Sequence, residues 1–324
     1  MSVANSKVKL GVLLPTRGLL LGDGPPTGTD VVLDMARRAE AAGLESVWVG
    51  DSLTAKPRLE PLAALAAVAA VTKRVRLGTA VLLAALRHPV LLAQTIATVD
   101  LISRGRLTIA AGVGGAFNDE QRQEWQAAGV DPAQRARRLE ELVQIVRLLG
   151  AGPPVTFSGK HFQLDRVVLD PKPVQEGGVP LLLACHWRAG GRTAQFQRAA
   201  RLADGIISIS DTPGEYAKVV EHVRGMAADL DRDPQHLETV FYITVNVGQN
   251  VASAEAEAEG FLTRYYGANI WGDRWGPFGD PERVRQRVVE YAEAGAETVI
   301  VRFASFEPER QLEIFLDRVA PAFL

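Results

Sequence analysis

Short apolar runs alternate with longer segments of helical periodicity along the whole chain. Each run is rich in Val, Ile and Leu, and the segment after it has apolar side chains at helical spacing opposite a polar face. Between residues 30 and 42, Val32, Met35 and Ala39 share one face, while Arg37 and Arg38 lie on the other. The pattern predicts eight strands, at 9–14, 46–50, 75–83, 106–112, 180–185, 205–210, 240–247 and 297–303. It predicts helices at 30–42, 59–72, 89–103, 132–149, 192–202, 213–230, 252–266, 281–294 and 307–319.

The strands are too apolar to face water on either side. Runs such as 181–184 and 299–301 must be covered on both faces, which favours a parallel sheet with crossover helices. Eight strand-helix units in 324 residues fit a closed (β/α)8 TIM barrel better than an open doubly wound sheet. We therefore expect an α/β fold in which residues 1–324 form a single barrel domain.

Two stretches exceed what a minimal barrel needs. The first, at about 152–178, follows the helix after the fourth strand, and its apolar pieces at 155–157 and 162–164 predict a short hairpin. The second, at about 267–279, follows the seventh strand and carries Trp271 and Trp275. It is predicted to be either a lid over the active face or a hydrophobic cap over the preceding helix.

Charge and cysteine content narrow the function classes. With 36 basic and 38 acidic residues the net charge is -2, so no overall field attracts nucleic acid or an anionic membrane. Cys185 is the single cysteine and no Cys/His cluster has zinc-ligand spacing, so we expect no metal site and a reducing, cytoplasmic location. Pro15 and Arg17 interrupt the N-terminal apolar runs, which argues against an export signal or a membrane span.

The loop after the fifth strand carries a candidate phosphate site. Gly190 and Gly191 directly precede a predicted helix, so their N–H groups lie at the positive end of its dipole, where Arg192 and Thr193 add a cation and a hydroxyl. The alternative is that the glycine pair only makes a tight turn. In a barrel this loop belongs to the active face.

The sequence lacks the common motifs in which side chains or a bound metal ion carry out the catalytic chemistry. The sequence has no Gly-x-Ser-x-Gly elbow, no Walker loop, no histidine pair with metal spacing and no lysine at the end of the sixth strand. A site with few ionisable groups suits an enzyme whose cofactor supplies the reactivity while the protein positions it. This combination favours redox chemistry.

Several short motifs, in order, resemble one known family. They are SVWVGD at 46–51, VRLGTAV at 75–81, RHPVLLAQ at 87–94, GVG at 112–114, PKPVQ at 171–175 and GDPE at 279–282. The chain resembles the bacterial luciferase-like superfamily (the LLM family) of flavin- or deazaflavin-dependent oxidoreductases. Its motifs are most similar to those of the branch that uses the deazaflavin coenzyme F-420.

The resemblance implies where the cofactor lies. It implies a TIM barrel with an isoalloxazine-type ring across the C-terminal face and a non-proline cis peptide near Ala80 and Val81, in a bulge on the third strand. Asp51 would line the ring, although it could equally cap a loop, and Ala80 and Val81 would be barrel core with or without a cofactor. The positions assigned to cofactor binding are Thr79, Ala80, Val81, Gly112, Gly114, Asn118, Gly190, Gly191, Arg192 and Thr193.

One position departs from the family pattern. Many members carry a histidine after the aspartate that ends the second strand, whereas this chain has Ser52. The catalytic candidates are therefore Asp51, Ser52 and His186, of which His186 could also be a merely solvated loop histidine. The tryptophans expected at the substrate or in the lid are Trp187, Trp271 and Trp275.

By resemblance, the predicted function is F-420-dependent hydride transfer to or from a small organic substrate, in a homodimer. The alternative is an FMN-dependent monooxygenase supplied by a separate flavin reductase. A non-catalytic flavin-binding protein and a non-redox barrel lyase are further hypotheses. Arg17, Lys56, Arg58 and Arg192 could form a basic channel for the polyglutamate tail of F-420, or could be ordinary surface charge.

Overall fold

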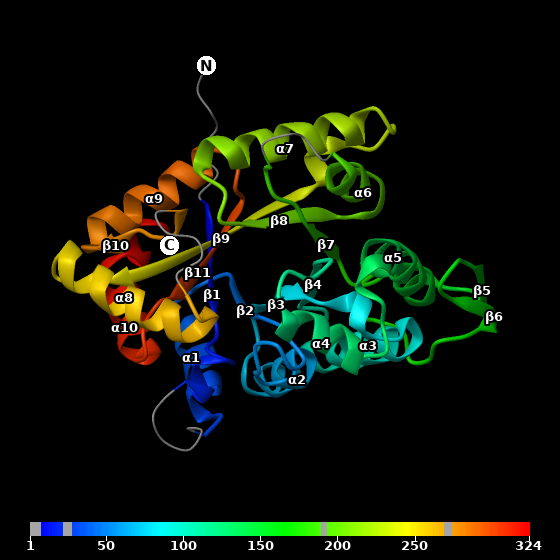
Figure 1. The fold of residues 1–324 in the computed structure, drawn as a ribbon, viewed down its shortest axis with the longest axis horizontal. Helices are drawn as coiled ribbons and strands as arrows, with labels where there is room; N and C mark the ends of the chain where they lie inside the picture. Colours follow the sequence, from blue (N-terminus) through cyan, green and yellow to red (C-terminus); the bar gives the residue numbers. More distant parts are fainter. Residues whose placement is uncertain (1–7, 22–27, 189–192, 269–273) are drawn as a thin grey trace.

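A closed parallel barrel forms the centre of the computed structural model, which describes residues 8–21, 28–188, 193–268 and 274–324. In Figure 1 the barrel strands lie inside a ring of helices, and the predicted (β/α)8 architecture is confirmed. The barrel strands are β1 (Lys9–Leu13), β2 (Ser46–Val49), β3 (Arg76–Leu82), β4 (Leu107–Ala111), β7 (Leu181–Ala184), β8 (Gly205–Ile209), β9 (Glu238–Val247) and β11 (Thr298–Phe303). Parallel pairing runs in this order, and β11 pairs with β1 to close the barrel.

Helices follow the strands and cover the outside of the barrel. They are α1 (Asp30–Ala41), α2 (Pro61–Val71), α3 (Pro89–Ser103), α4 (Asp119–Ala127), α5 (Arg135–Ala151), α6 (Ala194–Leu202), α7 (Pro213–Ala228), α8 (Val251–Tyr266), α9 (Pro281–Glu293) and α10 (Pro308–Arg318). Several starts obey capping rules: Asp280 accepts from the Arg283 N–H, and Thr212 forms a capping box with Glu215. Helix α4 was not predicted, because its sequence is polar and only Glu124 and Trp125 are buried.

The inside of the barrel is filled by a second apolar cluster, distinct from the layer between strands and helices. Its members are Leu13, Trp48, Ala80, Ala110, Leu182, Ile207, Val240, Tyr242 and Ile300. Trp48 fits because a Cβ at Gly11 or Gly78 would collide with its indole, and its Nε1 donates to Ser46 Oγ at 2.8 Å. The interior of the barrel is therefore a packed core rather than an open channel.

The first insertion contains the predicted hairpin. Strands β5 (Val155–Ser158) and β6 (Gln163–Val167) pair antiparallel. Glu141 of α5 holds the turn by accepting from the backbone N–H groups of Lys160, His161 and Phe162. The hairpin is thus anchored to the outer helix layer.

Of the second insertion, the structure describes residues 267–268 and 274–279. Strand β10 (Phe278–Gly279) extends the sheet beside the end of β9. Trp275 is buried and packs in a cluster with Phe261, Leu262 and Tyr265 of α8. Trp275 is thus placed as expected for the hydrophobic cap, whereas Trp271, the other tryptophan of the predicted lid, lies outside the described residues. Within the described residues, no helix combines the length and the apolar character needed to span a lipid bilayer.

Candidate functional site

A cavity of about 200 Å³ lies at the carboxyl ends of the barrel strands. Its walls come from many elements, as expected for the active face of a TIM barrel. The residues that line it are Leu13, Gly50, Asp51, Arg58, Ala80, Val81, Leu83, Ala184, His186, Ile207, Ser208, Ile209, Tyr242, Tyr265 and Tyr266. Small and apolar side chains form much of the surface, and polar groups are few.

The floor of the cavity contains the predicted cis peptide. The Ala80–Val81 bond is cis, and the register between β3 and β4 shifts at this point, so the bulge is confirmed. Gly112 at the end of β4 makes room for it, since a Cβ there would lie 2.8 Å from Val81 Cγ2. The same Cβ would lie 3.6 Å from the Cβ of Ala184. Val81, Gly112 and Ala184 therefore form one small-residue surface.

Asp51 lines the cavity, but its carboxylate is already engaged. Arg87 donates to Oδ2 at 2.5 Å and to Oδ1 at 3.1 Å, and the Leu83 N–H donates to Oδ2 at 2.8 Å. Burial lowers the pKa of Arg87, but the hydrogen bonds to Asp51 and the negative charge of Asp51 outweigh burial. The pKa of Arg87 is therefore raised. The Asp51 side chain is 2% exposed. Asp51 thus ties β2 to the chain that leaves the bulge.

Ser52 does not line this cavity. Its hydroxyl donates to Glu124 Oε1 at 2.7 Å. The same oxygen accepts from the backbone N–H groups of Leu53, Thr54 and Ala55. Glu124 of α4 therefore fixes the loop after β2, and Ser52 is part of that fixation.

His186 lies on the cavity wall in a hydrogen-bonded chain. Its Nδ1 lies 3.1 Å from Ser208 Oγ, and the Ser208 hydroxyl donates to Asp211 Oδ2. Burial and the nearby Arg188 lower the pKa of His186 to about 4. Burial raises the pKa of Asp211 to about 6, although hydrogen bonds from Ser208 and Trp187 oppose this. The imidazole is therefore neutral near pH 7.

Tyrosines and an arginine form another part of the cavity wall. Tyr265 and Tyr266 end α8, Tyr242 lies on β9, and Arg58 lies in the loop after β2. Behind them Arg302 of β11 is 3% exposed, and its Nη1 donates to Tyr266 Oη at 2.5 Å. Sequence reasoning named Arg58 only for the cofactor tail and missed the rest. The sequence feature that could have pointed to this wall is Arg302, a charged residue inside the apolar run TVIVRF.

The other predicted residues are dispersed. Thr79 is buried and exchanges hydrogen bonds with the backbone of Ala110. Asn118 is exposed and caps α4 by accepting from the Gln121 N–H. Gly114 adopts φ 71° above Trp125, which a Cβ would approach to 2.8 Å.

Two predicted residues pack against helices. Trp187 stacks on Phe196 at 6.5 Å between ring centroids and contacts His222 of α7, so it faces the helix layer. Trp275 packs against Tyr266 at 5.0 Å. Thr193 directly precedes α6. The predicted positions Gly190, Gly191, Arg192 and Trp271 lie outside the described residues.

Known proteins resemble this chain along most of its length. The family model described as luciferase-like monooxygenase matches residues 8–271. An F-420-dependent glucose-6-phosphate dehydrogenase of Amycolatopsis mediterranei (strain U-32) is 29% identical over 322 residues, with 90% of this chain and 93% of that protein covered.

A ketoreductase and a solved structure extend the comparison. The phthiodiolone/phenolphthiodiolone dimycocerosates ketoreductase of Mycobacterium sp. (strain JLS) is 28% identical over 283 residues, with 78% of this chain and 72% of that protein covered. The structure of an F-420-dependent secondary alcohol dehydrogenase with an F-420-acetone adduct superposes with a TM-score of 0.80 at 23% identity, covering 98% of this chain and 99% of that one. The barrel, the cis bulge on β3 and the family match agree: the chain belongs to the luciferase-like monooxygenase family.

Proposed function

We propose that this protein is an F-420-dependent oxidoreductase that exchanges a hydride with a small organic substrate. The observation that carries the proposal is the cavity at the barrel mouth, whose floor is the cis Ala80–Val81 bulge. Relatives that match nearly the full chain are F-420-dependent dehydrogenases by name, which supports this cofactor. The substrate class that fits the names of these relatives is an alcohol or a carbonyl compound.

The residues around the cavity fit a flat ring. Gly50, Ala80, Val81 and Ala184 have small side chains, and Ile207 adds an apolar wall. A Cβ at Gly50 would collide with Arg58 Nη1, so this position keeps the cavity open beside that cation. We assign these five residues to the ring of the cofactor, and Thr193 to the phosphate end.

The deazaflavin, when bound, supplies or accepts the hydride, and the protein has to position the substrate and manage a proton. The apolar floor excludes water from the reacting face. The neutral His186 can accept a hydrogen bond, and its link through Ser208 to Asp211 fixes the orientation of its ring. Asp51 and Arg87 connect β2 to the residue that follows the bulge, through the bonds of the Asp51 carboxylate to Arg87 and to the Leu83 N–H.

Several further assignments stay predictions. They are the single domain over 1–324, the cytoplasmic location, the homodimer, and the roles of Asp51, Ser52 and His186. The alternative cofactor is FMN, which would require a reductase partner.

The proposed activity predicts cofactor-linked turnover. Purified protein should reduce oxidised F-420 with one of a panel of alcohols and sugar phosphates, or oxidise reduced F-420 with a ketone, aldehyde, enone or imine. The measurement is the absorbance of the oxidised deazaflavin over time, with heat-inactivated protein as the control. Bound F-420 with no hydride exchange in either direction would contradict the enzymatic proposal and leave a non-catalytic cofactor-binding protein.

A further inference from the structure

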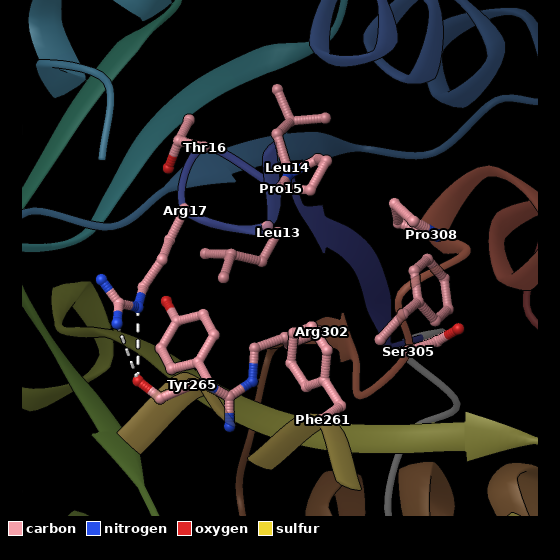
Figure 2. A pocket seen from close by; sticks show the side chains of 12 residues that line it. Leu13, Leu14, Pro15, Thr16, Arg17, Phe261, Tyr265, Arg302, Ser305 and Pro308 are labelled. Atoms are coloured by element: carbon pink, nitrogen blue, oxygen red, sulfur yellow. Dashed lines mark hydrogen bonds between the residues drawn. The ribbon is translucent and has the colours of Figure 1, made fainter. Parts of the chain in front are cut away.

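Three arginines surround the Tyr265 side chain. The guanidinium carbon lies 5.0 Å from the ring centroid for Arg17, 5.2 Å for Arg302 and 5.8 Å for Arg58. Figure 2 shows the Tyr265 ring between Arg17 and Arg302, with Arg17 also bonded to the Tyr265 backbone oxygen. The three arginines come from the loops after β1 and β2 and from β11, so the barrel fold itself brings them together.

No carboxylate of the described ranges forms an ion pair with these arginines. Arg17 donates to the backbone oxygens of Tyr265 and Pro57, and Arg58 donates to that of Lys56. Arg302 donates to Thr244 Oγ1 at 3.1 Å and to Tyr266 Oη, and among the described residues its Nη2 has no hydrogen-bond partner. Aromatic faces surround Arg302 instead, with Trp275 at 4.5 Å.

A buried cation without a neutralising partner lowers the stability of the folded protein. Moving a charge out of water costs several kcal/mol unless a partner replaces the lost hydration. Here three positive charges face a phenol that lines the substrate cavity. Such a field favours negative charge on the phenolic oxygen.

The field acts differently on Tyr265 and on the other tyrosines. Burial alone would raise the pKa of Tyr265, but the charges of Arg58, Arg302 and Arg17 and a hydrogen bond from Arg58 lower it below its usual value. Burial raises the pKa of the other four tyrosines of the chain, Tyr216, Tyr242, Tyr266 and Tyr291. Tyr265 is the exception because it lies nearest to all three arginines.

Other titratable groups on the cavity are less suited to give up a proton near neutral pH. Both oxygens of Asp51 are bonded to Arg87. The imidazole of His186 is already neutral near pH 7 because its pKa is about 4. Ser52, the third predicted catalytic residue, does not line the cavity, and its hydroxyl is bonded to Glu124. Tyr242 and Tyr266 belong to the same part of the cavity wall as Tyr265, but burial raises the pKa of both. The Tyr266 hydroxyl oxygen also accepts a hydrogen bond from Arg302.

We propose that Tyr265 is the residue that binds the reacting oxygen of the substrate and exchanges a proton with it. The inference rests on the proposed hydride transfer. When a hydride adds to a carbonyl carbon, the electron pair of the C=O π bond moves to oxygen, and that oxygen takes the proton of Tyr265 Oη. In the reverse direction the phenolate takes the hydroxyl proton as the carbon loses hydride. After the forward reaction solvent returns a proton to the phenolate, and after the reverse reaction solvent takes the proton from the phenol.

The first test needs no cofactor. Ultraviolet titration of the protein alone should show one tyrosine ionising below about pH 10, the ordinary value, and four ionising above it. The early transition should be lost in Tyr265→Phe, kept in Tyr266→Phe, and moved to higher pH in Arg302→Met. Titration of the wild type with no early transition, or its survival in Tyr265→Phe, would overturn the inference.

The second test uses the protein loaded with F-420. Tyr265→Phe should lower kcat roughly 100-fold, the size expected for a lost general acid, while the Kd for F-420 and the Tm stay near those of the wild type. Tyr266→Phe is the matched control with a smaller expected loss. Unchanged turnover of Tyr265→Phe, when the wild type exchanges hydride, would refute this inference alone. If the wild type does not bind F-420, the proposed function fails, and the ultraviolet titration still reports on Tyr265.

Discussion

Ala184→Phe should weaken F-420 binding by roughly 100-fold, equivalent to about 2.7 kcal/mol, without unfolding the barrel. Ala184 ends β7 on the small-residue floor, where its Cβ lies near Gly112 and Val81. A phenyl group there would occupy much of a cavity of about 200 Å³. Because the side chain at this position is only half-buried, it can extend into the cavity and need not disturb the core.

Fluorescence titration with F-420 measures this loss, and thermal unfolding shows whether the variant is folded. The matched control is Ala67→Phe, the same change at an exposed position on α2, which should bind F-420 as the wild type does. Wild-type affinity in Ala184→Phe would mean that the ring does not lie on this floor. A large fall in Tm would mean that the substitution disturbs packing instead, and Ala184→Val would then replace it.

Arg87→Met should lower the free energy of unfolding by about 3 kcal/mol, because it leaves a buried carboxylate without its cation. Within the described part of the chain, Asp51 would keep only the N–H of Leu83 as a partner. Glu60 would lose a partner at a half-exposed site, which costs little. Since Asp51 joins β2 to the residues after the cis bulge, we also expect weaker cofactor binding. Denaturant unfolding at neutral pH measures the stability.

The double variant Arg87→Met with Asp51→Asn separates the pair from the individual residues. Removing both charges should recover more than half of the loss, since no buried charge is then left unpaired. A single variant as stable as the wild type would contradict the assignment of Asp51 and Arg87 as a stabilising pair. A double variant that is less stable than the single one would do the same.

The sequence predicted the barrel because its signal is local and repeated. The apolar runs and the amphipathic segments predicted each barrel strand to within about two residues, and Asp280 and Pro281 marked the start of α9. The pattern of apolar residues did not predict the polar helix α4, because this helix buries little apolar surface. The buried Glu124 of α4 accepts hydrogen bonds from the loop at 52–55. More than 60 positions separate these residues in the chain, so no local periodicity predicts the contact.

The site was predictable only in part. The cis bulge at Ala80 and Val81 followed from the family resemblance, and Asp51 and His186 followed from their places after strands. The arginines around Tyr265 could not be foreseen, because they depend on how the end of α8 packs against β11 and two loops. Arg302 in an apolar strand was the one visible anomaly, since a charge there must either be paired or serve a purpose.

Binding of F-420 and FMN distinguishes hydride transfer from oxygen chemistry. The purified protein is titrated with F-420 and with FMN, each oxidised and reduced, and cofactor fluorescence and absorbance are followed. The account predicts saturable binding of F-420, weakened in Ala184→Phe and kept in Ala67→Phe, with much weaker binding of FMN. Preference for reduced FMN would contradict it in favour of oxygen chemistry, and binding of neither cofactor would exclude the redox function.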